Sequence, residues 1–417
     1  MNWLSFVLAR IPKHIEIDDN EEVLYMGTDY LEKFGRLIET TPKRTVANYL
    51  FWRVADFSVD YLSKNIRLVK LRFNEKLSGT ISLDQGWKKC VTESVYNYKH
   101  AIGSMYIQRN LKENDQIGAT QLVESIKLKV KQLTDESRWM KKTESEAVLK
   151  MLNDIKMLIG FPPQYLDNQL IIDYHKDVNF DENSDYFQAT FELFLFWKMK
   201  ELSFLRENVL NTQWEVVIDI NEVISGFSTT NNFLSMSIAF LNSPFYSRDV
   251  NNYLNYAGLG AEAGELIYYS VDNQLIALNS IEYQNQTRCF VKQYEKYLKD
   301  VHNLTLSADH MNRQLAASNG GFKIAYETYK DSNKQSRNEL KLPGLNFTTK
   351  QLFWIAAAQM YCNKNRPEEL LRKVSSSDEV LDKFKVIGSL QNSLDFSYDF
   401  NCVSGSIMNP VNKCEIF

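Results

Sequence analysis

Several features that would narrow the class of this 417-residue chain are missing from it. No segment has the ~18 consecutive apolar residues that a membrane-spanning helix needs. The short apolar stretch at residues 3–9 has neither a basic start nor a clear cleavage site, so no signal peptide is evident. Lys and Arg total 48 against 52 Asp and Glu, without a long run of one sign. We therefore expect no membrane span in this chain and no nucleic-acid partner.

Motifs of several common enzyme classes are also absent. The sequence has neither a G-x-x-x-x-G-K-[ST] nor a G-x-G-x-x-G phosphate loop. Its five histidines include no pair at i and i+4, the spacing that places two metal ligands on one side of a helix. No Cys/His or Ser/His nucleophile arrangement can be argued from spacing alone. No replacement chemistry is visible in these residues.

Cysteine content leaves the cellular compartment open. The five cysteines could be scattered buried thiols of an intracellular protein. Three N-x-[ST] triplets, at Asn285, Asn303 and Asn346, favour secretion weakly, because such triplets often arise by chance.

The composition is that of a folded globular protein. Hydrophobic residues make up 44%, charged residues 24% and aromatic residues 13% of the chain, which argues against disorder. A chain of this length exceeds what one hydrophobic core usually supports, so two domains are expected.

The first half has a helical pattern. Leu122, Ile126, Val130 and Leu133 form an apolar stripe at helical spacing. Similar helical patterns occur at residues 48–73 and 88–111. The helical pattern is interrupted at residues 160–163. It resumes at residues 187–209 as an aromatic-rich helix that is expected to be deeply buried.

The pattern changes near residue 210. Residues 214–220 and 233–240 favour short strands, and helical patterns return at residues 256–269, 287–298, 311–329 and 348–362. This change predicts one domain at residues 1–209 and another at residues 210–417.

Several short motifs occur in a fixed order along the chain. The most specific lie near its end, and they are Leu342-Pro343-Gly344-Leu345, Gln351-Leu352-Phe353, Cys362 with Arg366-Pro367-Glu368, residues 384–392, Phe400-Asn401-Cys402, Met408-Asn409-Pro410 and Lys413-Cys414. Weaker motifs precede them at residues 87–90, 103–106, 138–140 and 159–162. In order and spacing, this series resembles the neprilysin and endothelin-converting-enzyme family of zinc metallopeptidases.

This resemblance implies a mainly α fold, in which residues 1–209 form a helical capping domain. Residues 210–417 would form a thermolysin-like α+β zinc-peptidase domain. Members of the family carry a few hundred further residues before the point that matches Met1. The chain therefore looks N-terminally shortened, with an incomplete capping domain.

The resemblance also locates the family's zinc site. Its members use H-E-x-x-H on one helix and a Glu from a second helix as ligands, with the first Glu as general base. The pattern at residues 255–260 sets the register, so Glu265 and Tyr269 replace the two histidines and Leu266 replaces the base. The Asn319-Gly320-Gly321 motif sets the register of the second helix. Gln314 then stands where the family has its third ligand, and Ser318 stands where the family has an Asp that orients a ligand His.

These replacements predict an inactive homologue without metal or cofactor. Glu265 alone would have to hold an ion that catalytic sites bind with three protein ligands, and Leu266 cannot accept a proton. Two interpretations of the altered positions remain open. They pack and hydrogen-bond within a former cavity, or they form a remodelled pocket that still captures peptides.

The substrate-binding positions have changed as well. Asn221 aligns with an Asn that hydrogen-bonds the substrate backbone in the family, and Lys385 replaces an Arg with the same role. Lysine keeps the charge but not the planar fork of arginine. Glu379 stands where the family has a transition-state-stabilising His.

The family's cysteine pairing bears on localisation. The counterparts of Cys289 and Cys414 form a disulfide in the family, so we expect that bridge and an extracellular or cell-surface location. The counterparts of Cys90, Cys362 and Cys402 pair with cysteines upstream of this chain's start, which would leave these three without their usual partners.

Three functional hypotheses result. The first is a catalytically inactive extracellular glycoprotein that binds peptides or extracellular proteins. The second is a zinc metalloendopeptidase that cleaves small peptides. The third is a shortened gene product without a stable fold of its own.

Overall fold

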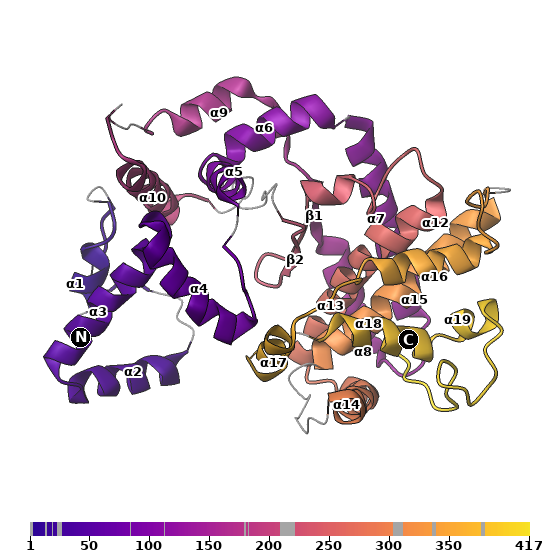
Figure 1. Cartoon of the computed structure of the whole chain (residues 1–417). Coiled ribbons are helices and arrows are strands. Elements are labelled where there is room, and N and C mark those ends of the chain that lie inside the picture. Colours follow the sequence, from indigo (N-terminus) through magenta and orange to yellow (C-terminus); the bar gives the residue numbers. More distant parts are fainter. Residues whose placement is uncertain are drawn as a thin grey trace. The chain divides into compact units, whose positions relative to one another are not determined.

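The chain forms two compact units that are each continuous in space but not in sequence. The computed structural model describes residues 3–12, 15–18, 20–22, 27–83, 85–111, 113–178, 181, 183–208, 222–302, 312–335, 339–376 and 380–417. The helical unit comprises Met1–Asn97 and Asn168–Val216, and the mixed unit comprises Tyr98–Asp167 and Val217–Phe417. Both are mainly helical, as expected (Figure 1).

The helical unit is held together by aromatic contacts between distant helices. Phe57 packs on Phe194 with ring centroids 6.0 Å apart, and the Trp197 indole donates to the carbonyl of Asn97 at 3.0 Å. Its helices are α1 (Trp3–Leu8), α2 (Thr28–Thr40), α3 (Lys43–Ser58), α4 (Lys64–Ser78), α5 (Gly86–Asn97), α9 (Asn168–His175) and α10 (Tyr186–Ser203). The expected deep burial of residues 187–209 is wrong for α10. Leu193 is its single buried residue, because the described helices of this unit cover the other side chains only in part.

The mixed unit contains the remaining helices and a small sheet. They are α6 (Lys99–Asn110), α7 (Glu113–Asp135), α8 (Lys142–Asp154), α12 (Asn252–Asn255), α13 (Ala261–Ala277), α14 (Ile281–His302), α15 (Asn312–Gln335), α16 (Thr349–Gln359), α17 (Pro367–Ser376), α18 (Asp382–Asn392) and α19 (Leu394–Asp399). The helices expected within residues 256–362 are confirmed. The apolar stripe of α7 is confirmed too, since Leu122, Ile126 and Val130 are buried. No helix in the described part of the chain is long and apolar enough to cross a membrane.

Three strands form the sheet of the mixed unit, in the order β1-β3-β2. Strand β1 (Lys156–Gly160) runs parallel to β3 (Phe233–Ser237), and β2 (Ser225–Ser228) runs antiparallel to β3. The strand expected at residues 233–240 is confirmed in its first part, and residues 238–241 continue as a 3₁₀ turn. The strand expected at residues 214–220 lies outside the described residues.

This sheet explains why the division differs from the expected boundary at residue 210. Strand β1 pairs with β3 across more than 70 residues of chain, so the segment that carries it belongs with the C-terminal half. Helix α7 of the same segment packs against α13 and α15. Residues 98–167 therefore share a core with residues 217–417.

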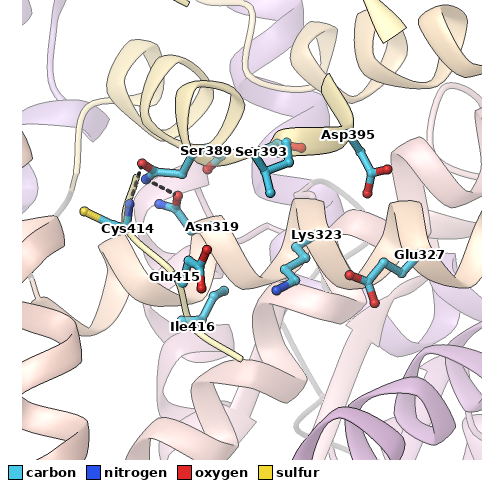
Figure 2. A pocket seen from close by; sticks show the side chains of 11 residues that line it. Asn319, Lys323, Glu327, Ser389, Ser393, Asp395, Cys414, Glu415 and Ile416 are labelled. Carbon is cyan, nitrogen blue, oxygen red and sulfur yellow. Dashed lines mark hydrogen bonds between the residues drawn. The ribbon is translucent and has the colours of Figure 1, made fainter. Parts of the chain in front are cut away.

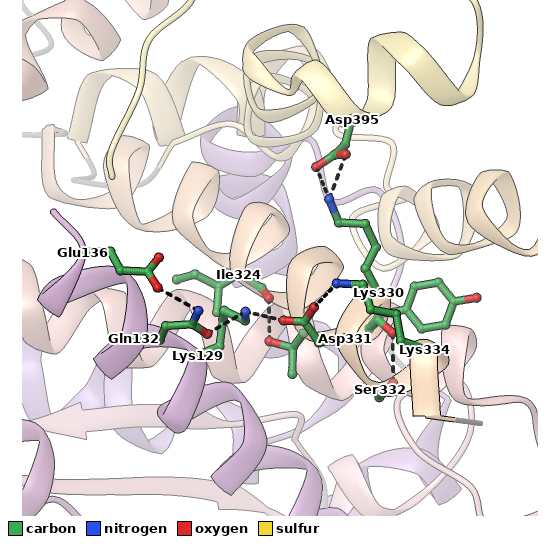
Figure 3. A network of polar contacts seen from close by, with 11 residues as sticks. Lys129, Gln132, Glu136, Ile324, Lys330, Asp331, Ser332, Lys334 and Asp395 are labelled. Carbon is green, nitrogen blue, oxygen red and sulfur yellow. Dashed lines mark hydrogen bonds and ion pairs between the residues drawn. The ribbon is translucent and has the colours of Figure 1, made fainter. Parts of the chain in front are cut away.

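Polar contacts reinforce the packing of α7 on α15. Lys129 of α7 is only 9% exposed and bonds to Asp331 of α15 (Figure 3). Gln132 accepts a second bond from Lys129 at 2.9 Å. Lys330, which directly precedes Asp331 on α15, contacts both carboxylate oxygens of Asp395 on α19 at 2.9 Å. These contacts tie three helices of the mixed unit together.

Helices α13 and α15 approach each other unusually closely because glycine lies at their contact. A Cβ atom on Gly321 would lie 2.6 Å from the carbonyl oxygen of Ala261, and one on Gly264 would lie 3.0 Å from Cα of Gly321. A side chain at either position would force the helices apart. The close contact brings Glu265 of α13 next to Ser318 of α15.

Candidate functional site

Helix α13 carries three of the predicted site residues. A buried π-helical turn at Tyr256–Gly260 leads directly into it. Glu265 and Tyr269 lie one turn apart, and Leu266 follows Glu265. All three side chains are half-buried, so this part of α13 borders both the core and solvent.

Glu265 is the centre of a network of donors from other elements. Lys385 of α18 places its Nζ 3.2 Å from Oε1 of Glu265, and the Tyr361 hydroxyl donates to Oε2 at 3.0 Å. The Ser318 hydroxyl of α15 lies 3.1 Å from Oε1 and 2.8 Å from the carbonyl oxygen of Gln314, within hydrogen-bond distance of both. The side chains of Glu265 and Lys385 are 15% and 18% exposed, so the ion pair is largely shielded from water.

The electrostatics of the site favour a charged lysine and a neutral phenol. Burial opposes the charge on Lys385, but attraction to Glu265 and Glu262 outweighs it, so the pKa of Lys385 is raised. Burial, together with repulsion from the two carboxylates, raises the pKa of Tyr361 well above its ordinary value. Both groups therefore act as donors to Glu265 at neutral pH.

A second carboxylate, Glu262, lies one turn before Glu265 on α13. The Ser225 hydroxyl, from the first residue of β2, donates to its Oε1. Burial and the neighbouring Glu265 raise the pKa of Glu262, while the bond from Ser225 and the charge of Lys385 act in the opposite direction. Glu262 thus connects the network to the sheet.

The third predicted ligand position is also engaged in protein contacts. Gln314 is half-buried, and its Oε1 accepts a hydrogen bond from the backbone N–H of Val380 at 2.9 Å. This bond joins α15 to the segment just before α18. The predicted residues Glu379 and Asn221 lie outside the described residues.

The structure therefore brings together part of the predicted set. Glu265 contacts both Ser318 and Lys385, and the backbone carbonyl oxygen of Gln314 lies within hydrogen-bond distance of the Ser318 hydroxyl. Sequence reasoning missed Glu262 and Tyr361. The i, i+3 spacing of Glu262 and Glu265 in an apolar helix could have identified the first, whereas Tyr361 has no comparable signal.

A buried acid was also missed on the next turns of α13. Asp272 is 1% exposed, accepts a hydrogen bond from the Tyr283 hydroxyl and lies 3.7 Å from Nε of Arg313. Burial raises the pKa of Asp272 to about 6, although both partners favour its charged form.

A separate cavity lies between α15, α18 and the last residues of the chain. Its volume is about 180 Å³, and none of the predicted site residues lines it except Cys414 (Figure 2). Lys323 and Glu327 of α15 border it, and Lys323 Nζ donates to the carbonyl oxygen of Phe417 at 3.2 Å.

The predicted disulfide is confirmed. Cys289 of α14 and Cys414 are bonded, with their Cα atoms 5.6 Å apart. Among the described residues, Cys90, Cys362 and Cys402 form no disulfide.

The described side chains do not supply a set of ligands for a catalytic metal. No group of three or more His, Cys, Asp or Glu side chains that could hold an ion occurs in the described ranges. Of the three predicted ligand positions, Glu265, Tyr269 and Gln314, Glu265 alone carries a carboxylate, and three other side chains already contact it. This set does not fit a site that needs three protein ligands, so we derive no chemical step through a metal.

Comparison with known proteins matches the chain to a peptidase family. Residues 1–162 match the N-terminal model, and residues 225–416 the second model, of peptidase family M13. Neprilysin-2 of Drosophila melanogaster is 29% identical over 442 residues, and human endothelin-converting enzyme 1 is 28% identical over 431 residues. Each match covers 100% of this chain but only 57% and 55% of those proteins, so the chain spans little more than half of their length.

Solved structures share the fold. The zinc metalloprotease Zmp1 of Mycobacterium tuberculosis, bound to an inhibitor, aligns with a TM-score of 0.79 at 19% identity over 93% of this chain and 60% of that chain. PepO from Lactobacillus rhamnosis aligns with a TM-score of 0.70 at 16% identity, covering 90% of this chain and 58% of that chain.

These findings correct one prediction. The expectation of no cofactor is wrong, because zinc is the cofactor of the metallopeptidase family that the chain matches. At the predicted ligand positions this chain itself has Glu265, Tyr269 and Gln314. With both family models matched in order and the fold shared with solved members, the chain belongs to peptidase family M13, the neprilysin-like metallopeptidases.

Proposed function

We propose that this chain is a catalytically inactive, neprilysin-like homologue that binds peptides or extracellular proteins without hydrolysing them. The observation that carries the proposal is the network around Glu265. Its carboxylate contacts Lys385, Tyr361 and Ser318, and its neighbour on α13 is Leu266.

Hydrolysis of a peptide needs a group that takes a proton from the attacking water. At the position where the family has this base, Leu266 offers no lone pair. Loss of general-base catalysis costs about 10²- to 10⁴-fold in rate. Both carboxylate oxygens of Glu265 already contact other side chains, Lys385 and Ser318 at Oε1 and Tyr361 at Oε2, which leaves it unsuited to replace the base.

Peptide binding is supported by the position of β2. Within the described part of the sheet, β2 is an edge strand that pairs with β3 alone. An edge strand offers backbone N–H and C=O groups to an extended peptide, which adds as a further strand. Helix α13 packs against β2, so a peptide on this edge would lie near Glu262 and Glu265. In this proposal, Lys385 and Asn221 contribute to peptide contacts.

An extracellular or cell-surface location is part of the proposal. The disulfide between Cys289 and Cys414 suits an oxidising compartment. Asn285 and Asn346, the acceptors of two N-x-[ST] triplets, are both exposed and would accept glycans.

The test combines turnover with binding on the full chain. A fluorogenic neprilysin-type peptide, incubated with and without added zinc, should remain uncleaved, while its uncleaved analogue should bind in a fluorescence-anisotropy titration. Cleavage abolished by a chelator would instead establish the alternative function, a zinc metalloendopeptidase of small peptides. Absence of binding to a broad peptide panel would refute the binding role.

A further inference from the structure

Three carboxyl groups lie close to one ammonium group in this part of the site. Glu262, Glu265 and Asp382 all act electrostatically on Lys385. Lys385 forms its ion pair with Glu265, at 3.2 Å. The printed partner of Glu262 is the hydroxyl of Ser225, which is neutral. Among the described residues, Lys385 is thus paired with Glu265, and Glu262, beside β2, has no cationic hydrogen-bond partner.

Glu262 also has acceptor capacity to spare. Its Oε1 accepts from Ser225, and no described residue donates to its Oε2. Both oxygens of Glu265, by contrast, already accept from other side chains. Glu262 is half-buried, so a cationic donor that reached it would form a charge-assisted hydrogen bond partly shielded from water.

Building on the proposed peptide binding, we infer that this site selects peptides with a basic side chain, lysine or arginine, which pairs with Glu262 when the peptide lies along the edge of β2. Ser225 and Glu262 are bonded to each other across the β2–α13 contact, so the carboxylate stands next to the strand that would receive the peptide. A basic side chain would complete the second ion pair of the cluster. A neutral peptide would leave Glu262 without a cationic partner.

Two variants test the inference, because they are expected to change the preference for a basic peptide in opposite directions. Glu262→Gln keeps the size and the acceptor for Ser225 but removes the charge. Lys385→Gln removes the competing cation and frees Glu265. A purely structural role would weaken binding of all peptides in both variants. Charge selection instead predicts that the preference for a basic peptide falls in the first variant and rises in the second.

The experiment is a titration of two matched peptides that differ only by lysine against norleucine at one position, scanned along the sequence. For the unaltered full chain we expect the lysine peptide to bind about tenfold more tightly at the matching position. In Glu262→Gln this ratio should fall to about threefold or less, and in Lys385→Gln it should increase. Glu327→Gln, a half-buried glutamate of α15 outside this network, is the matched control and should keep the ratio unchanged.

Each outcome separates the inference from the proposed function. Equal binding of both peptides at every position would overturn the inference and leave peptide binding in place. No binding of either peptide would contradict the proposed function itself. A lysine preference that persists unchanged in Glu262→Gln would overturn the assignment to Glu262. Circular dichroism of each variant would show that it is folded.

Discussion

At the residue scale, the account depends on what Glu265 contacts. Register relative to Asn255-Tyr256 and Asn319-Gly320-Gly321 predicts that Glu265, Gln314 and Ser318 take the family's site positions, and the structure places Glu265 next to Ser318. The ion pair with Lys385 was not predictable, because its partner is 120 residues away in sequence. Tyr361 was missed for the same reason. Such contacts depend on how helices pack, which a local pattern does not reveal.

The ion pair provides the first prediction. Lys385→Met leaves Glu265 largely buried beside Glu262 without its cation, so the mixed unit should lose about 1.5–3 kcal/mol of unfolding free energy. Replacing both partners, as Glu265→Leu with Lys385→Met, should cost less than Lys385→Met alone, because no unpaired charge remains. Urea unfolding of both variants measures this. A double variant less stable than the single one would contradict the ion-pair account.

Asp272 provides a prediction about pH. Its pKa of about 6 in the folded chain exceeds the ordinary value of 3.8, so the folded chain binds this proton more tightly than the unfolded chain does. Its contribution to stability is therefore fully present below about pH 4 and is lost as the pH rises through about 6. Asp272→Asn should remove this dependence. Relative to the variant, the unaltered chain should gain up to about 3 kcal/mol between pH 7 and pH 4. Urea unfolding of both chains across this pH range measures the difference. If the stability profiles of the unaltered chain and of Asp272→Asn run parallel, the prediction is refuted.

At the scale of elements, helices were more predictable than strands. The apolar stripe of α7 and the later helical patterns correspond to real helices because each pattern repeats over several turns. Strand β1 was missed inside a helical region. It has only five residues, and it forms because β3 pairs with it from a distant part of the chain.

The contact between α13 and α15 gives the element-scale prediction. Gly321→Ala places a Cβ 2.6 Å from a carbonyl oxygen of α13 and 3.1 Å from Cβ of Glu265. We expect a loss of about 1–3 kcal/mol from overpacking, together with displacement of Glu265 from Ser318. Gly388→Ala in α18 is the control. Its nearest neighbours lie 3.7 and 3.8 Å away, so it should be neutral or stabilising by up to about 1 kcal/mol. Thermal unfolding of the two variants compares them, and equal stability would count against the close approach.

At the scale of the whole molecule, the family and fold class were predictable from ordered motifs. The division into units was not, because residues 98–167 join the C-terminal half through a parallel strand pair and the packing of α7. Neither the strand pairing nor the helix packing can be recognised from the composition of the segments involved. The cofactor prediction failed because it was drawn from the altered ligand positions alone, whereas the family that the chain matches uses zinc as its cofactor.

The disulfide gives the molecular-scale stability prediction. Cys289 and Cys414 are 125 residues apart in sequence, so their bond constrains much of the unfolded mixed unit. Replacing both with serine should cost about 2–5 kcal/mol of stability, measured as the shift in the urea midpoint. Cys402→Ser, which breaks no disulfide, should have a much smaller effect. Similar midpoints for the two variants would contradict the structural role of the bond.

The central claim, binding without hydrolysis, is tested most directly by one measurement. The purified full chain is incubated with a neprilysin-type peptide in the presence of zinc, and mass spectrometry quantifies peptide fragments over time with and without a chelator. The account predicts intact peptide in both samples, because Leu266 cannot act as a base and Glu265 is held by Lys385, Tyr361 and Ser318. Fragments that accumulate with zinc and vanish with the chelator would contradict it and identify an active peptidase.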